Sequence, residues 1–294
     1  MKIQLLNGGL ANQAFQYIFA KYYEFSHPGQ IMYLDDSWFV FNTVHNGYEL
    51  EKVFGIKAPM LSDVFDEEVW SFILEQKKQG KSVPQILCEN GIPVYMLAEV
   101  DEYKESNPFD GQVYRTPANQ YNPEILNYKE DIYYHGYWIN KNWFDTYRDE
   151  FLKIFTFPAI TDEKNKQYMD SILNSNSCSI HIRRGDYVTL GLAMEIERYR
   201  ELIENYLSQC EGEWELFVFS DDIDWCKEHC EELGLSLFPK VHFIEGNVQG
   251  KNYIDLQLMS NCKAMIITDS AFGYLAALLN TRMEFVLNPT PREV

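Results

Sequence analysis

The second half of the chain alternates short apolar runs with amphipathic segments, and this alternation limits the possible folds most. Apolar runs of strand length begin at residues 177, 215, 240 and 264. Each is followed by a segment with the apolar spacing of a helix. Strands that alternate with helices predict a parallel sheet covered by helices on both faces. We therefore expect an α/β fold over this half.

The first half opens with a similar strand, turn and helix, at residues 2–6, 7–13 and 14–25. A second strand is expected within 30–39, and an aromatic-rich strand and helix within 131–157. Residues 60–130 are less regular, with one helix-like segment at 62–80 followed by polar, loop-like sequence. Pro158 and a helix-capping Thr161 separate the two periodic halves. We predict an N-terminal domain over residues 1–160 and a C-terminal domain over 161–294.

The formal net charge of −19 argues against nucleic acid or an anionic membrane surface as a partner. An anionic small ligand would need a local basic site. The six cysteines form no CxxC pair, and reduced, buried thiols are favoured over a metal site at Cys226, His229 and Cys230. Neither a signal peptide nor an apolar stretch of transmembrane length is visible. We expect a cytoplasmic protein, either free or peripheral to the inner membrane.

Polar or glycine-rich residues follow four of the predicted strands. Ligands of open α/β sheets bind beyond the carboxyl ends of the strands, so these segments are the candidate binding residues. The alternative is that they are ordinary polar loops. The segments are residues 7–13, 181–186, 220–222 and 268–271.

The first of these segments, NGGLANQ, carries Gly8 and Gly9. Paired glycines allow positive φ or a close approach of the backbone, and the following helix offers free N–H groups to an anion. The spacing fits neither the dinucleotide nor the P-loop motif. An ordinary strand–turn–helix corner would look the same.

The second segment, HIRRGDY, places Arg183 and Arg184 directly after a strand. Guanidinium groups bind phosphate oxygens bidentately and keep their charge. Neighbouring side chains of a strand point to opposite faces, so the two arginines are expected to diverge. One would reach a phosphate while the other holds the loop, with Asp186 as a partner. A salt-bridged surface turn is the alternative.

The two remaining segments carry Asp222 and Ser270. Asp222 either accepts hydrogen bonds from a nucleobase, binds a metal or caps a helix. Ser270, or its neighbour Asp269, caps an apolar helix whose first N–H groups would face a ligand. No G-x-S-x-G elbow is present, so a serine nucleophile is disfavoured. A metal is also disfavoured, because arginines and helix starts stabilise diphosphate charge without one.

Taken together, these segments resemble family 11 glycosyltransferases, the α-1,2-fucosyltransferases that use GDP-fucose. HIRRGDY is similar to a His-x-Arg-Arg-x-Asp peptide shared by α-1,2-, α-1,6- and protein O-fucosyltransferases. The resemblance runs in the expected order from Lys2 to about Pro289. The other segments that carry it are GGLANQAFQYIFAK, GYWINKNWF, FVFSDDIDWCK and DLQLMSNCKAMIITDSAFGYLAALLN.

The resemblance implies a GT-B-like α/β architecture, with two Rossmann-like domains facing a cleft. GDP-fucose, the donor substrate, would lie mostly on the C-terminal domain, and the N-terminal domain would lie on the acceptor side. Fucose would pass to the 2-hydroxyl of a terminal galactose on an oligosaccharide, with inversion and without a metal or other cofactor. A different linkage such as α-1,6, or a non-catalytic nucleotide- or glycan-binding protein, is the alternative. A Rossmann oxidoreductase is disfavoured by the missing GxGxxG.

The resemblance also implies roles for individual residues. Arg183 would contact phosphate, Arg184 and Asp186 would hold the loop, and Asn12 would lie beside the reacting centre. Asp222 would contact guanine and Ser270 a phosphate. The implied catalytic residues are Arg183, Asn12 and Asp186, and the implied donor-binding residues are Gly8, Gly9, His181, Arg183, Asp222, Thr268, Ser270, Ala271 and Phe272.

Three points stay open in the sequence. Ala11 stands where the family usually has glycine, so it must adopt negative φ or tolerate strain. The aromatic side chains at 133–143 either stack on sugars or belong to an interdomain core. The base that accepts the proton of the acceptor hydroxyl is not identified. Its candidates are Asp36, Asp186, Glu195 and Glu197.

Overall fold

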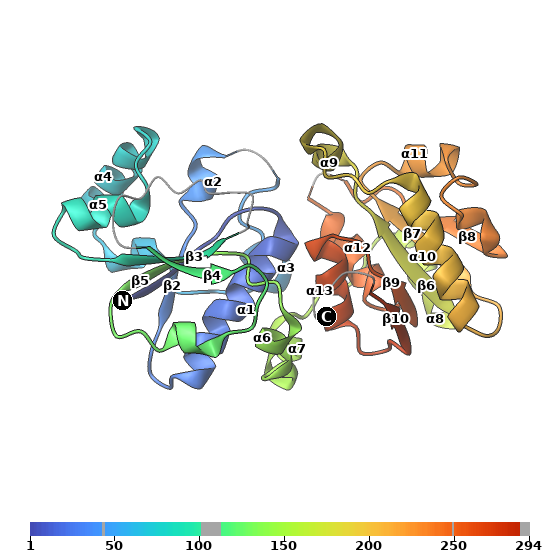
Figure 1. Cartoon of the computed structure of the whole chain (residues 1–294), viewed down its shortest axis with the longest axis horizontal. Helices are drawn as coiled ribbons and strands as arrows, with labels where there is room; N and C mark the ends of the chain where they lie inside the picture. The colour runs from blue at the N-terminus through green and yellow to red at the C-terminus, as the bar shows by residue number, and fades with distance from the viewer. Residues whose placement is uncertain (43–44, 101–112, 249, 289–294) are drawn as a thin grey trace. The chain divides into compact units, whose positions relative to one another are not determined.

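The computed structural model describes residues 1–42, 45–100, 113–248 and 250–288. The chain divides into two compact units between Thr156 and Phe157, four residues before the predicted boundary. Each unit contains a five-stranded parallel sheet with helices (Figure 1). We call them the N-terminal and C-terminal units.

In the N-terminal unit the strand order is β2-β1-β5-β3-β4. The central neighbours β1 and β5 are parallel, with Ile3 opposite Tyr133. The strands are β1 (Lys2–Leu5), β2 (Met32–Asp35), β3 (Tyr95–Val100), β4 (Val113–Pro117) and β5 (Ile132–His135). The helices are α1 (Leu10–Ser26), α2 (Trp38–Phe41), α3 (Leu50–Phe54), α4 (Glu67–Lys78), α5 (Val83–Glu89), α6 (Lys141–Asp145) and α7 (Arg148–Ile154), with 3-10 turns at Leu61–Val64 and Pro123–Leu126.

The aromatic segment after residue 131 forms core inside the N-terminal unit. Alternate side chains of a strand face opposite sides of the sheet, and Ile3 and Tyr133 pack with apolar residues of α4 and α5. On the other side, the ring of Trp138 stacks on Phe19 of α1 at 4.2 Å, and Trp143 contacts the edge of the same ring. These buried rings offer no face to a sugar, so the stacking alternative is wrong for them.

The sequence prediction was wrong about loops between residues 60 and 130. The structure forms α5 and two strands there, β3 and β4. β4 lies at the edge of the sheet, and its residues are mostly half-buried or exposed. Its sequence VYRTP therefore lacks the apolar run or clean alternation by which strands are recognised.

In the C-terminal unit the strand order is β10-β9-β6-β7-β8, and the predicted strands β6 to β9 are confirmed. The short strand β10 was not predicted, and α11 is shorter than expected. The strands are β6 (Ser177–Ile182), β7 (Glu215–Ser220), β8 (Lys240–Phe243), β9 (Ala264–Ile266) and β10 (Phe285–Leu287). The helices are α8 (Glu163–Asn174), α9 (Gly185–Leu190), α10 (Ile196–Gln209), α11 (Ile223–Glu228), α12 (Asn252–Met259) and α13 (Ala271–Leu279), with a 3-10 turn at Leu235–Leu237.

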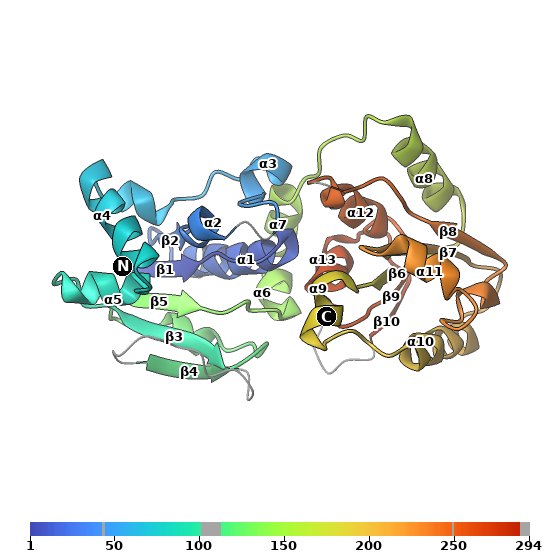
Figure 2. The same cartoon turned by 90° about the horizontal axis from the view of Figure 1, so that it is seen from above.

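Strand β6 is buried along its whole length, and its two sides differ. Ile180 and Ile182 pack in an apolar cluster with α10, whereas His181 contacts Phe272 of α13 on the other side. Figure 2 shows α10 and α12 on opposite sides of this sheet. The residues that follow β6 are therefore placed at the middle of a doubly covered sheet.

Within the described ranges, no helix combines the length and the apolarity needed to cross a membrane. The six cysteines are unpaired. Burial raises the pKa of the Cys226 thiol to about 11, so the thiolate that binds metals is disfavoured there. No group of three His, Cys, Asp or Glu side chains in the described ranges is arranged to hold a metal ion.

Candidate active site

The order of strands in the C-terminal unit creates a switch point between β6 and β9. The chain runs outward from β6 to β7 and β8, then returns to β9 on the opposite side of β6. Ligands of open α/β sheets bind outside the strand ends at such points. Ile180 lies opposite Ile266, and the hydroxyl of Thr268 donates to the carbonyl of His181 at 2.7 Å. The structure thus brings the 181–186 and 268–272 segments together.

Helix α13 begins at this switch point. Ser270 is its N-cap, and its hydroxyl accepts a hydrogen bond from the backbone N–H of Phe272 at 3.3 Å. The first-turn N–H groups of a helix have no acceptor within the helix and carry the positive end of its dipole. The side chains of Thr268 and Ser270 are buried beside this turn. The start of α13 is therefore suited to an anion such as a phosphate.

His181 is a neutral member of the site. Its side chain is 7% exposed, and its ring lies 5.0 Å from the ring of Phe272. Burial, with a smaller contribution from the charge of Arg183, lowers the pKa of His181 to about 3. Within the described part of the chain, its buried Nδ1 has no hydrogen-bond partner. The imidazole is therefore uncharged at neutral pH and cannot serve as a cationic acid.

The two arginines after β6 have different partners. The Nη1 and Nη2 atoms of Arg183 lie 2.7 Å from carboxylate oxygens of Asp221 and Asp186, respectively. Arg184 lies over the indole of Trp225, with its guanidinium carbon 3.5 Å from the ring centroid, and its Nε is 3.4 Å from Asp222. Arg183 is therefore held by two carboxylates, while Arg184 is held mainly by stacking.

Arg183 keeps donors for a further anion. A guanidinium has five N–H donors, and the two ion pairs engage one donor at each Nη atom. Two arginines face three carboxylates in this group, so its net charge is one negative. A phosphate bound here would therefore depend on directed N–H groups of Arg183 and α13 rather than on an excess of positive charge.

Asp222 takes one of the three roles that the sequence left open, the helix cap, and also pairs with Arg184. It is the N-cap of α11, where its Oδ1 accepts from the backbone N–H of Trp225 at 3.4 Å. Its Oδ2 faces Arg184. The helix cap is thus a structural role of Asp222, and contact with a nucleobase stays a prediction.

In the N-terminal unit, the glycine turn between β1 and α1 is tightly closed. Gly8 has φ of +76°, and a Cβ atom there would lie 2.5 Å from the side-chain Nδ2 of Asn12. The buried Gln13 ties the turn to a second loop, because its Nε2 donates to the carbonyls of Gly8 and Gly47 at 3.0 and 2.9 Å. Ala11 lies in α1 without positive φ, so the strain considered for it does not arise.

A carboxylate of the chain itself lies near the start of α1. Glu49 is fully buried, and its Oε1 accepts a hydrogen bond from Asn46 Nδ2 at 3.1 Å, while its Oε2 has no partner among the described residues. Burial raises the pKa of Glu49. The negative charge of Glu49 disfavours an anionic ligand near this helix start, and contact of Asn12 with a substrate stays a prediction.

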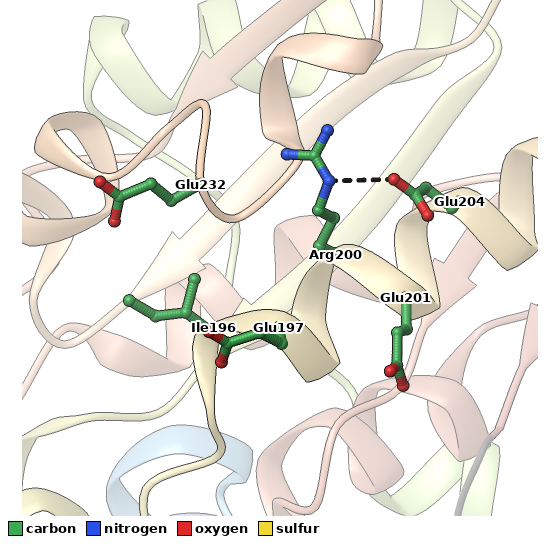
Figure 3. A pocket seen from close by; sticks show the side chains of 6 residues that line it. All are labelled: Ile196, Glu197, Arg200, Glu201, Glu204 and Glu232. Atoms are coloured by element: carbon green, nitrogen blue, oxygen red, sulfur yellow. Dashed lines mark hydrogen bonds and ion pairs between the residues drawn. The ribbon is translucent and has the colours of Figure 1, made fainter.

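The four candidate bases lie in different surroundings. Burial and the neighbouring Asp35 raise the pKa of Asp36 at the end of β2, whereas Asp186 is paired with Arg183. Glu195 and Glu197 are exposed around the start of α10. Figure 3 shows Glu197 at a hollow that also contains Glu201, Glu204, Glu232, Arg200 and Ile196. Four carboxylates around one arginine make this hollow unsuited to an anionic donor.

Comparison with known proteins gives the family. A sequence model described as "Glycosyl transferase family 11" matches residues 112–291, more than half of the chain. The chain belongs to glycosyl transferase family 11. It is 32% identical over 97% of its length to an α-1,2-colitosyltransferase of Escherichia coli, covering 90% of that protein. It is also 27% identical to the mouse galactoside 2-α-L-fucosyltransferase Sec1, over 49% of this chain and 41% of that protein.

The fold of this family 11 glycosyltransferase is also similar to a solved structure. The structure of the α-1,6-fucosyltransferase NodZ co-crystallised with GDP matches with a TM-score of 0.52 and 14% identity, over 95% of this chain and 92% of that one. At this identity the likeness concerns the fold alone. Together with the two parallel sheets, it confirms the predicted GT-B-like α/β class.

The sequence did not predict the contacts of two residues of this glycosyltransferase, Asp221 and Glu49. Asp221 was one of several polar residues after a strand, and the structure shows it bound to both arginine positions. Glu49 carried no sequence signal, because it reaches α1 from a loop that lies far along the chain. Glu49 stands between apolar residues in YELEKVF, but such single charged residues are too common in sequences to indicate a contact with a helix start.

Proposed function

We propose that this glycosyltransferase transfers L-fucose from GDP-fucose to the 2-hydroxyl of a terminal galactose, with inversion. The observation that carries the proposal is the hydrogen bond between Thr268 and the carbonyl of His181, which joins the segment before Arg183 to the segment before α13 at the β6–β9 switch point. This arrangement offers directed N–H donors to a diphosphate. The similarity to mouse Sec1, a galactoside 2-α-L-fucosyltransferase, supports the donor sugar, acceptor and linkage.

In this proposal, the C-terminal unit is the donor unit. The diphosphate contacts Arg183, the N–H group of Ala271 and the hydroxyl group of Ser270. Thr268 and Phe272 shape the site, since the Thr268 hydroxyl donates to the carbonyl of His181 and the Phe272 N–H donates to Ser270. Asp222, at the end of β7, accepts hydrogen bonds from guanine. His181 packs beneath the site as a neutral ring. The N-terminal unit binds the acceptor, with Gly8 and Gly9 allowing the backbone to turn closely and Asn12 beside the reacting centre.

In the proposed reaction, charge develops on the leaving phosphate of the donor. As the bond to the sugar breaks, negative charge grows on the β-phosphate, and Arg183 with the α13 N–H groups stabilises it. These groups act without a metal ion. Inversion requires the acceptor hydroxyl to attack from the opposite face and to lose its proton to a base. Among the candidate bases, Asp36 combines partial burial with a raised pKa, which favours proton uptake.

A second donor sugar is favoured by a specific observation. The relative with 32% identity over nearly the whole chain is named for transfer of colitose. Colitose is L-fucose without its 3-hydroxyl group, so both sugars fit the same diphosphate site. GDP-colitose is therefore the second candidate donor.

A product screen tests this proposal. GDP-fucose and GDP-colitose are each incubated with lactose, lacto-N-biose and N-acetyllactosamine, in the presence of EDTA, and product linkages are determined by NMR. We expect an α-1,2-fucosyl product at galactose. Transfer of colitose alone would establish the second donor, and an α-1,6 product would contradict the linkage. GDP binding without transfer to any acceptor would show a non-catalytic binding protein.

A further inference from the structure

Asp221 links the segment after β6 to the neighbouring strand. It follows directly after β7, whose last residue, Ser220, lies opposite Ile182 of β6. Its Oδ2 is 2.7 Å from Nη1 of Arg183, and its Oδ1 accepts from the backbone N–H of Arg184 at 2.8 Å. One carboxylate thus fixes both the side chain of the first arginine and the backbone of the second.

The other carboxylate at Arg183 is placed differently. Asp186 lies only three residues further along the chain, at the start of α9, and binds Nη2. Its side chain is 42% exposed, against 25% for Asp221. Asp221 is therefore the better anchored of the two partners, because it comes from a separate strand and makes two contacts with the 183–184 segment.

The backbone next to the arginines leaves room for this carboxylate. A Cβ atom at Gly185 would lie 2.5 Å from Oδ2 of Asp221 and 3.3 Å from its Cγ. Gly185 does not have positive φ, so the close approach of Asp221 is the feature that requires glycine here. The contact between Asp221 and Arg183 thus depends both on the position of Asp221 after β7 and on the space that Gly185 leaves for its carboxylate.

We propose that Asp221 is a positioning residue that directs the guanidinium of Arg183 toward the developing charge on the leaving group. This inference rests on the proposed function. Small errors in the placement of a catalytic group reduce the rate steeply, while ground-state affinity depends on the charge itself. Removing the charge of Asp221 leaves the positive charge of Arg183 in place and takes a negative charge away. The effect is therefore expected in kcat and not as weaker GDP binding.

Asp221→Asn tests the inference, because asparagine keeps the volume and an oxygen for the Arg184 N–H but loses the charge facing Arg183. We expect kcat to fall by about 10- to 100-fold, while the Kd for GDP, measured by calorimetry, stays equal or becomes smaller. The matched control is Asp224→Asn in α11, whose side chain is 86% exposed and pairs with Lys227. It should keep wild-type kcat and Kd.

Gly185→Ala is the second variant, because it keeps every charge and displaces the Asp221 carboxylate by contact. We expect the same pattern, a lower kcat with unweakened GDP binding. Wild-type kcat in Asp221→Asn overturns the inference. A parallel loss of kcat and GDP affinity in both variants, with a lower Tm, also overturns it, because that pattern indicates a structural role alone. Wild-type protein that neither binds GDP nor transfers sugar overturns the proposed function itself.

Discussion

Arg183→Ala is expected to fold and to lose about 10²- to 10³-fold in kcat for sugar transfer, equivalent to about 3–4 kcal/mol of barrier. In the proposed function, the guanidinium stabilises the charge on the leaving phosphate. Its removal also leaves Asp186 and Asp221 without their shared partner. The remaining carboxylates repel a diphosphate, so KM for the donor is expected to rise as well.

Arg183→Lys is expected to lose nearly as much kcat as Arg183→Ala. Lysine keeps the charge but lacks the planar guanidinium that binds two carboxylates and a phosphate together. The measurements are steady-state kinetics with GDP-fucose and the Tm of each variant. Arg200→Ala is the control, because Arg200 pairs with Glu204 in the acidic hollow of α10. Turnover near that of the wild type in Arg183→Ala would show that another group stabilises the leaving phosphate.

His181 is expected to make the C-terminal unit sensitive to acid. Its pKa is about 3 in the folded protein, against an ordinary value of 6.5. Below pH 6.5, His181 binds a proton in the unfolded chain, whereas in the folded chain it stays neutral down to about pH 3. Stability that is fully present above pH 6.5 is therefore lost as the pH falls through this window. Between pH 7.5 and 5.0, the free energy of unfolding should fall by about 2 kcal/mol through this residue.

Urea unfolding of the wild type and of His181→Gln, at pH 7.5 and 5.0, measures this contribution. Glutamine does not titrate, so the variant should lose about 2 kcal/mol less than the wild type over the same interval. A change in stability that the substitution causes equally at both pH values cancels when the two pH-dependent losses of unfolding free energy are compared. Equal losses in both proteins would show that His181 is not held neutral by burial.

The sequence predicted the strands β6 to β9 from their alternation with helical segments. β7 contains the apolar run LFVF, as expected for a strand with helices on both sides of its sheet, whereas the buried β6 alternates isoleucine with serine and histidine. β4 was missed because it lies at a sheet edge and carries mixed polarity, and β10 because it has only three residues. Burial alone does not explain the outcome, because β3 lies inside its sheet and was missed, whereas β8 lies at a sheet edge and was predicted.

The candidate site was predictable where its residues directly follow a strand. Arg183 and Ser270 lie at the carboxyl ends of β6 and β9, which the alternating pattern identifies. Asp186 was predicted as an arginine partner and pairs with Arg183. Asp221 was not predictable as a partner, because its place depends on the register between β6 and β7 that brings it beside the arginines. Glu49 was out of reach for the same reason, since its contact with the start of α1 exists only in the folded chain.

Binding of the donor nucleotide at the β6–β9 switch point is tested most directly by hydrogen exchange with and without GDP. The first N–H groups of α13 have no acceptor within the helix, so they exchange readily until a phosphate binds them. We predict that GDP slows exchange in peptides that cover residues 268–273 and 181–187, and leaves residues 7–13 unchanged. Slower exchange at residues 7–13 with no change at 268–273 would contradict the account.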